Sequence, residues 1–279
     1  MAKRKIVVTG AAGYDAGRML PALRQRYDTV LLDVKTTDRQ GQEVAGVQVV
    51  DLLDRDRGQY RPYFEGADAV VHCGFVRTGD GEARYWNEAD NLSMAHNVYR
   101  ACQDQGVRRA VVVSSNHAAD YYENLIWSGK LDFVDAQMLP LSDNFYGWAK
   151  ASYELMGFMF ACGKEGPALE NVQLRVGGPR ETDIDGCTAA DLQKMHRALG
   201  AYLSVRDQVQ LVVKSIEAED IRDANGVPFQ IFYGISGNGH NFWSLANARR
   251  VIGYAPQDDS QVRFADKVAA LTRAAGEGA

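Results

Sequence analysis

A short apolar strand that runs directly into a glycine-rich turn constrains the fold of this chain more than any other feature. Residues 6–9 are apolar or β-branched, and Gly10-Ala11-Ala12-Gly13 follows them. Gly10 permits a tight turn, and Gly13 lets the backbone approach a phosphate at the N-terminus of the next helix. The pattern therefore predicts a strand, a turn and a helix that together hold a dinucleotide.

Strand and helix signals alternate through the first two thirds of the chain. Apolar, β-branched runs predict strands at residues 6–9, 29–34, 47–50, 69–72, 110–113 and 172–176. Helical spacing predicts helices at residues 18–25, 89–105 and 146–162. Apolar strands separated by helices favour a parallel sheet that is covered on both faces. We therefore expect an α/β fold with a Rossmann-type, doubly wound parallel sheet, and ligands at the carboxyl ends of its strands.

The last third of the chain has a different pattern. Residues 177–188 are rich in Gly, Pro and charged residues, which predicts a loop. A helix, a strand and a second helix are expected after it, at residues 199–217, 229–234 and 243–252. The tail from Ala274 is expected to be frayed.

The length of 279 residues fits one large α/β domain, alone or with a small appendage. We expect residues 1–176 to form a dinucleotide-binding Rossmann core that carries the catalytic residues. Residues 177–279 are expected to form a small substrate-binding lid that is interwoven with this core.

Charge and composition exclude several classes of function. The net charge of −5 argues against a nucleic-acid surface, which needs clustered Lys and Arg. No apolar run reaches about 18 residues, so no membrane span is expected. The chain has four scattered cysteines without metal-ligand spacing, namely Cys73, Cys102, Cys162 and Cys187. Free thiols in a reducing cytoplasm, and no metal site, are the expectation.

Acidic residues follow the second and third predicted strands. Asp33 lies 20 residues after Gly13, where a carboxylate would hold the adenosine ribose hydroxyls. A carboxylate there disfavours a 2′-phosphate, so NAD is preferred over NADP. Asp51-Leu52 is placed to contact adenine. Asp15 lies within the turn, where it would repel a pyrophosphate, so we expect it to point to solvent or to cap the helix.

A phenol and an ammonium group lie one helical turn apart at Tyr146 and Lys150. The i, i+4 spacing puts them on one helix face. The ammonium and a bound nicotinamide would lower the pKa of Tyr146, which could then act as general base toward a hydroxyl. Ser115 ends the fifth predicted strand and would orient the reacting oxygen. Ser114 is its neighbouring candidate, although strand alternation makes it unfavourable for both to point inward.

These segments together resemble the extended short-chain dehydrogenase/reductase superfamily over most of the chain. The matching residues are Thr9–Gly13, Asp33, Asp51, Leu52, 71–74, Asn91, Ser115, Tyr146 and Lys150. The resemblance implies catalytic roles for Ser115, Tyr146, Lys150 and Asn91, the last supporting the lysine. It implies NAD contacts from Gly10, Ala12, Gly13, Tyr14, Asp15, Asp33, Asp51, Leu52, Cys73, Gly74, Tyr146 and Lys150.

Within that superfamily, the chain resembles uronate dehydrogenase and its sugar-dehydrogenase relatives. Ser-Ser-Asn-His at residues 114–117 is the most specific segment, and Arg197 aligns with an arginine that grips the uronate carboxylate. The substrate-binding residues that this resemblance implies are Phe75, Arg77, Ser115, Asn116, His117, Tyr146, Gly178 and Arg197. Gly178 replaces a family serine, and Arg77 either binds an anion or blocks the family's sugar. These departures suggest a changed substrate.

The resemblance implies oxidation of a sugar or sugar-acid hydroxyl to a lactone by hydride transfer to NAD. A nucleotide-sugar epimerase or dehydratase is the first alternative, but it usually has a larger C-terminal part, and a dehydratase needs an acidic pair where Asn116-His117 stands. A non-catalytic NAD-binding protein is the second, although such proteins usually lack the Tyr or the Lys. A homodimer through the helices at 89–105 and 146–162 is also implied. Apolar residues at 156 and 158–160 serve either that interface or the core.

Overall fold

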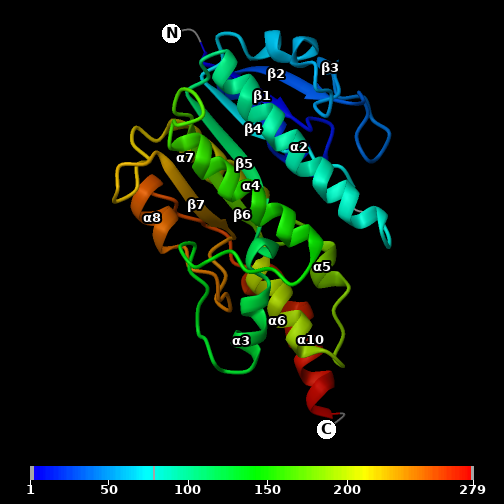
Figure 1. Ribbon diagram of the computed structural model, residues 1–279. Coiled ribbons are helices and arrows are strands. Elements are labelled where there is room, and N and C mark those ends of the chain that lie inside the picture. Colours follow the sequence, from blue (N-terminus) through cyan, green and yellow to red (C-terminus); the bar gives the residue numbers. More distant parts are fainter. Residues whose placement is uncertain (1–2, 78, 278–279) are drawn as a thin grey trace.

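The computed structural model describes residues 3–77 and 79–277, and its centre is a seven-stranded, wholly parallel sheet (Figure 1). The strands are β1 (Lys5–Thr9), β2 (Asp28–Asp33), β3 (Val47–Val49), β4 (Ala69–His72), β5 (Arg109–Ser115), β6 (Glu170–Val176) and β7 (Phe229–Gly234). Their order is β3-β2-β1-β4-β5-β6-β7. The chain reverses its winding between β1 and β4, where a doubly wound sheet opens a crevice for ligands. The predicted Rossmann-type sheet is confirmed.

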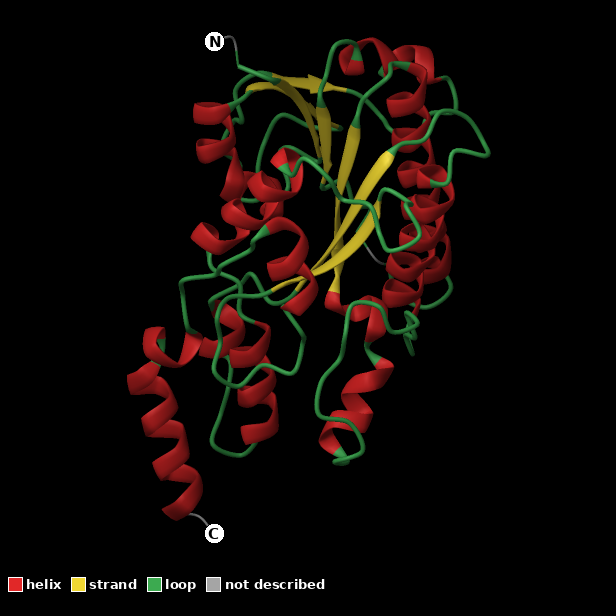
Figure 2. Ribbon diagram, turned by 90° about the vertical axis from the view of Figure 1, so that its left-hand side faces the viewer, coloured by secondary structure: helices red, strands yellow, loops and turns green. Residues whose placement is uncertain are grey.

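Helices cover both faces of the sheet (Figure 2). The longer ones are α1 (Tyr14–Arg26), α2 (Ala83–Asp104), α4 (Phe145–Ala161), α6 (Leu192–Ala201), α7 (Val205–Glu217) and α10 (Ala265–Glu277). The shorter ones are α3 (Tyr121–Trp127), α5 (Thr182–Asp185), α8 (Ala246–Ile252) and α9 (Ser260–Arg263). Within the described residues, no helix is long and apolar enough to cross a membrane.

The alternation of side chains along each strand divides the core into two layers. On β5, Val111 and Val113 belong to the layer that packs under α1 and α7. Ala110 and Val112 point the other way, into the layer under α2 and α4. Each strand is therefore apolar on both faces, as expected of a parallel sheet between helices.

The helix predicted at residues 199–217 is two helices, α6 and α7, and that prediction is wrong. Between them the chain is extended, because Gly178 N–H donates to Ala201 O and Leu203 N–H donates to Gly178 O. Ser204 then caps α7 by accepting a hydrogen bond from Asp207 N–H. Pairing with the segment after β6 breaks a pattern that is helical when read locally.

Three other segments differ from the sequence-based expectation. The strand at 229–234 is β7. It lies in the main sheet beside β6, and not in a lid above the sheet. The expected loop at 177–188 contains α5, and the tail expected to fray is helical in α10 through Glu277. Residues 278–279 lie outside the described residues.

The carboxyl ends of the strands all point toward one end of the sheet. Beyond that end lie α3, α5, α6 and α10, with the C-terminal helix farthest out (Figure 1). These elements come from the β5–α4 connection and from the last third of the chain. Segments that are distant in sequence therefore meet above the edge where a doubly wound sheet binds ligands.

Candidate active site

The glycine-rich turn brings two backbone segments into very close contact. Gly10 has φ +63°, a conformation that side chains with a Cβ rarely adopt. A Cβ built on Gly10 would lie 2.6 Å from Cys73 O, and one on Gly13 would lie 2.9 Å from Gly10 O. Ala12 is buried beside them. The turn therefore forms a close backbone cradle at the N-terminus of α1, which fits a pyrophosphate.

The acidic residues after β2 and β3 lie beside this cradle or at the sheet edge next to it. Asp33 Oδ2 accepts a hydrogen bond of 2.9 Å from Ala12 N–H, which fixes the carboxylate against the turn. Asp51 Oδ1 accepts from Leu53 N–H, while Leu52 is buried and its carbonyl accepts from Asn97 Nδ2. Asp33 thus stands where ribose hydroxyls would be held, and the whole arrangement fits a dinucleotide.

Tyr146 and Lys150 lie in the first turns of α4, which Asn144 caps by accepting from Gly147 N–H. Lys150 is buried, and its Nζ donates to Val113 O over 3.2 Å. The Tyr146 ring is flanked edge-on by Phe75 and His117, with ring centroids 5.6 Å and 5.5 Å away. The side chains that sequence analysis assigned to proton transfer therefore come together at the end of β5.

The pKa of Tyr146 is raised to about 12 in the chain alone, so the lowering expected with a bound nicotinamide stays a prediction. Burial is the largest cause, because it disfavours the phenolate, and hydrogen bonding with Ser115 offsets only part of it. Burial also lowers the pKa of Lys150 to about 8. The expectation included the positive nicotinamide, which is not part of the chain.

The two serines at the end of β5 point in opposite directions. Ser114 Oγ donates to the buried Glu154 carboxylate over 2.7 Å, on the side of α4 and β6. Ser115 lines a cavity of about 280 Å³ together with Tyr146. Strand alternation thus resolves the choice between them in favour of Ser115.

Asn116 and His117 line the same cavity. Asn116 is 2% exposed, and its Nδ2 has no hydrogen-bonding partner among the described residues. His117 Nδ1 lies 2.6 Å from an Asp120 carboxylate oxygen, which also accepts from Asn144 Nδ2. The aspartate orients the imidazole, and Asn116 offers a buried donor to a ligand.

Arg197 also lines this cavity, but its guanidinium already forms an ion pair with another side chain. Its Nε and Nη2 donate to the two carboxylate oxygens of Glu123 over 2.7 Å and 2.8 Å. Gly178 lies opposite, close to the Asp183 carboxylate. The predicted substrate residues Arg197 and Gly178 are therefore present in the wall, and Arg197 has an ion-pair partner.

Asp15 was expected to point to solvent or to cap α1, and it does neither. It is half-buried, lines the cavity, and accepts a hydrogen bond of 3.4 Å from Gln208 Nε2. Its negative charge acts on both Tyr146 and Lys150. The α1 N-terminus is capped by Gly13 without a side-chain bond, so Asp15 is turned toward the catalytic groups instead.

Four of the predicted catalytic and substrate residues are not part of the cavity wall, namely Phe75, Arg77, Asn91 and Lys150. Arg77 is exposed in the connection after β4, where its carbonyl accepts from Asn87 Nδ2. Asn91 pairs both ways with the backbone of Val76, accepting from N–H over 2.6 Å and donating to O over 3.0 Å. Asn91 thus secures the connection that carries Gly74 and Phe75, whereas Lys150 Nζ donates to Val113 O.

Sequence analysis missed two arginines of the cavity wall, Arg39 and Arg180. Both guanidinium groups stack on the ring of Tyr14, 5.4 Å and 5.9 Å from its centroid. Tyr14 itself donates to Pro179 O over 3.2 Å. Two exposed arginines near a predicted turn carry no periodic signal, so only the folded chain reveals that they meet.

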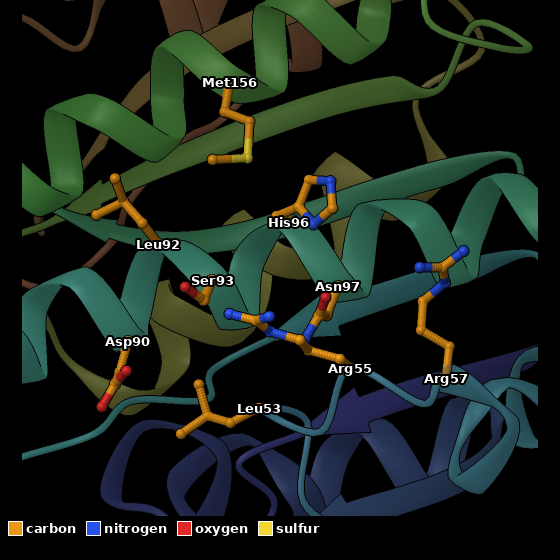
Figure 3. A pocket seen from close by; sticks show the side chains of 9 residues that line it. All are labelled: Leu53, Arg55, Arg57, Asp90, Leu92, Ser93, His96, Asn97 and Met156. Carbon is orange, nitrogen blue, oxygen red and sulfur yellow. The ribbon is translucent and has the colours of Figure 1, made fainter.

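A larger cavity of about 500 Å³ lies elsewhere, between α2, α4 and the connection after β3 (Figure 3). Arg55, His96 and Met156 point into it from these three elements. The residues proposed for hydride transfer lie in the other cavity. No group of three or more potential metal ligands is present in the described part of the chain.

The parallel sheet, the glycine-rich cradle and the Tyr146–Lys150 pair define a Rossmann-type, dinucleotide-dependent enzyme. Residues 6–156 match the model of the NAD dependent epimerase/dehydratase family. The chain belongs to this family.

Several relatives are named as dehydrogenases of sugars or sugar acids. The chain is 27% identical to the NAD-dependent glucose-6-phosphate dehydrogenase of Haloferax volcanii, covering 91% of this chain and 94% of the relative. It is 26% identical to a uronate dehydrogenase of Pseudomonas syringae pv. tomato, over 92% and 83%. Among solved structures it resembles a mutated uronate dehydrogenase, with a TM-score of 0.73, 23% identity, and coverage of 95% of this chain and 86% of that one.

Proposed function

We propose that this protein is an NAD-dependent dehydrogenase that oxidises a hydroxyl group of a sugar or sugar acid. The observation that carries the proposal is one cavity, beside the nucleotide cradle, that is lined by Tyr146, Ser115 and Asn116, whose Nδ2 has no partner among the residues that the structure describes. A phenol, a hydroxyl and an amide donor at one place suit a polyhydroxylated substrate. A cyclic aldose or uronate oxidised at its anomeric carbon would leave as a lactone.

In this proposal Tyr146 removes the proton of the substrate hydroxyl. Ser115 hydrogen-bonds the same oxygen and orients it, while Asn116 and His117 bind neighbouring hydroxyls. Lys150 supplies positive charge behind Tyr146, which favours the phenolate. Bound NAD supplies the acceptor for the hydride.

The cradle is proposed to bind NAD through the backbone of Gly10, Ala12 and Gly13, and through Asp33. The Asp33 carboxylate would accept from both ribose hydroxyls and repel a 2′-phosphate, which favours NAD over NADP. Leu52 and Cys73 would border the adenine and the pyrophosphate, respectively.

We further propose that residues 177–279 contribute the substrate-binding lid. Support comes from α5, α6 and the loop at Gly178, which supply Asp183, Arg197 and Arg180 to the cavity. We also propose that the protein is located in the cytoplasm. Its free cysteines, two of which are buried, are consistent with that reducing compartment.

A homodimer is proposed through the outer faces of α2 and α4, which contact each other. Phe158 and Met159 are both 40% exposed on α4, whereas Phe160 is buried in the core. Apolar exposure beyond the core-facing stripe is typical of a helix that packs against a partner.

The test is NADH formation, followed at 340 nm, across aldoses, uronates and sugar phosphates. Replacing Tyr146→Phe removes the proton acceptor and keeps the ring, so kcat should fall about 10²- to 10⁴-fold. NAD affinity should fall far less than kcat in this variant, because the ring is kept. Tightly retained NAD with sugar interconversion and no net NADH would favour an epimerase instead.

A further inference from the structure

We propose that Glu123 sets the substrate class by neutralising Arg197, so that the enzyme takes an uncharged aldose in preference to a uronate. The inference rests on the proposed dehydrogenase function and concerns the end of the cavity opposite the nucleotide cradle. It follows from the ion pair, from the neighbouring charges and from the donors that remain free.

The ion pair uses the side of the guanidinium that a substrate carboxylate would need. Nε and Nη2 of Arg197 form two parallel bonds to the Glu123 carboxylate, which is the bidentate geometry that Arg prefers for an acid. Glu123 is 14% exposed and Arg197 is 31% exposed, so water screens the pair only partly. A substrate carboxylate would have to displace Glu123 or approach a pair with no net charge.

The surrounding elements hold this pair in place. The Arg197 guanidinium lies 5.9 Å from the centroid of the Trp243 ring, and Trp243 is buried. Val134, in the segment after α3, forms a parallel bridge with Trp243. Glu123 also lies in the first turn of α3, where a negative side chain is stabilised. Both partners are thus fixed by packing before any substrate arrives.

Further acidic groups surround Arg197. Asp120 and Asp183 both act on its charge, in addition to Glu123, and Asp183 lines the cavity. Asp120 is engaged by His117 and Asn144, so it remains close behind the wall. Glu123, Asp120 and Asp183 together offset the charge of Arg197, which weakens its attraction for a carboxylate and leaves a neutral hydroxyl unaffected.

The other two arginines of the wall face the nucleotide side. Arg39 and Arg180 stack on Tyr14, the first residue of α1, directly after the glycine-rich turn. In the proposed complex their charges would meet the phosphates of the dinucleotide at this helix N-terminus. Among the described arginines of the cavity wall, Arg197 is then the one left to receive a substrate acid.

Donors suited to hydroxyl groups remain available. The two N–H groups on Nη1 of Arg197 are not used by Glu123, and Asn116 Nδ2 has no partner among the described residues. Both can donate to a neutral hydroxyl without a change of net charge. The site therefore fits the CH₂OH group of an aldose better than the carboxylate of the matching uronate.

Paired sugars that differ only at this group provide the test. Galactose is compared with galacturonate, and glucose with glucuronate, by kcat/KM and by calorimetric binding to the NADH-loaded protein. Wild type should favour the aldose about tenfold or more in both readouts. Glu123→Gln frees the charge of Arg197 and should shift the uronate-to-aldose ratio at least about tenfold toward the uronate.

Glu217→Gln is the matched control. Glu217 forms the same two-bond pair with Arg26, outside the cavity wall. This variant should leave the ratio unchanged.

A wild-type preference for the uronate overturns the inference, even if the Glu123 variant does not fold. An unchanged ratio in a folded Glu123→Gln variant, or no binding of either sugar, also overturns it. Binding with the expected preference but without any NADH would instead refute the proposed dehydrogenase function and leave the role of Glu123 supported.

Discussion

At the scale of single residues, the proposed role of Tyr146 depends on positive charge that favours its phenolate. The folded chain supplies only part of that charge. Burial raises its pKa to about 12, and Asp15, Glu88 and Asp120 all act in the same direction. The Nζ of Lys150 lies 5.5 Å from the centroid of the Tyr146 ring. We therefore expect the proposed proton removal by Tyr146 at neutral pH to require a charged Lys150 and a bound cofactor.

The pH profile of Lys150→Met should reveal this dependence. The base must be deprotonated, so kcat/KM rises with pH until Tyr146 has lost its proton. Removing the ammonium should move that rise to higher pH by about one unit or more. The measurement is the initial rate of NADH formation between pH 6 and 10.

Lys130→Met, at an exposed lysine in the connection after α3, is the control and should keep the wild-type profile. A Lys150→Met profile that superimposes on wild type would show that the ammonium does not act on the phenol.

The stacked arginines predict a contribution to cofactor binding. In Arg180→Ala the guanidinium beside Tyr14 is lost, and the Kd for NADH should rise about tenfold, because the inferred charge-assisted contact with a dinucleotide phosphate is removed. Titration of NADH fluorescence measures this directly. Arg206→Ala, which removes an exposed arginine paired with Asp258, should leave the Kd unchanged. An unaltered Kd in Arg180→Ala would show that this arginine does not contribute to cofactor binding.

At the scale of elements, a buried ion pair connects α4 to β6. Glu154 accepts from Arg175 over 2.8 Å and from Ser114 over 2.7 Å, and Glu154 and Arg175 are 1% and 0% exposed. This contact fixes the helix that carries Tyr146 against the strand next to β5. The position of Tyr146, the proposed base, therefore depends on the Glu154–Arg175 ion pair, which lies between α4 and β6.

Glu154→Gln should lower the free energy of unfolding by about 3–5 kcal/mol, because it leaves the Arg175 charge buried without its partner. Chemical denaturation followed by circular dichroism measures the loss. Asp220→Asn, in an exposed pair with Arg222, should not move the midpoint. A Glu154→Gln midpoint equal to wild type would mean that water or another group compensates Arg175.

At the scale of the whole molecule, apolar side chains remain exposed on one face. Leu155 is 59% exposed on α4, near Phe158 and Met159. The larger cavity, with Met156 in its wall, lies on the same side of α2 and α4. This face is the proposed dimer interface.

Leu155→Glu should convert the dimer to a monomer, since a buried charge without a partner is unfavourable at an interface. Light scattering after size-exclusion chromatography gives the mass. Val262→Glu introduces the same charge at a residue that is 78% exposed on α9, and it should leave the mass unchanged. A wild-type monomer at micromolar concentration would contradict the proposal.

Much of the sheet could be predicted from local pattern. Apolar runs and glycine positions predicted the first six strands within a few residues, and strand alternation favoured a single inward serine. The helix at 199–217 failed because Gly178, some 25 residues away, pairs with its middle and makes it extended. A local period contains no information about such a partner.

The sequence by itself determined the parallel sheet, the nucleotide cradle and the presence of Tyr146 and Lys150 on one helix face. These depend on residue types and spacings within a few turns of chain. Only the tertiary structure decided that Glu123 occupies Arg197, that Asp15 faces the catalytic groups and that burial raises the pKa of Tyr146. Ion pairing and desolvation depend on which distant segments meet, and that is a property of the folded chain alone.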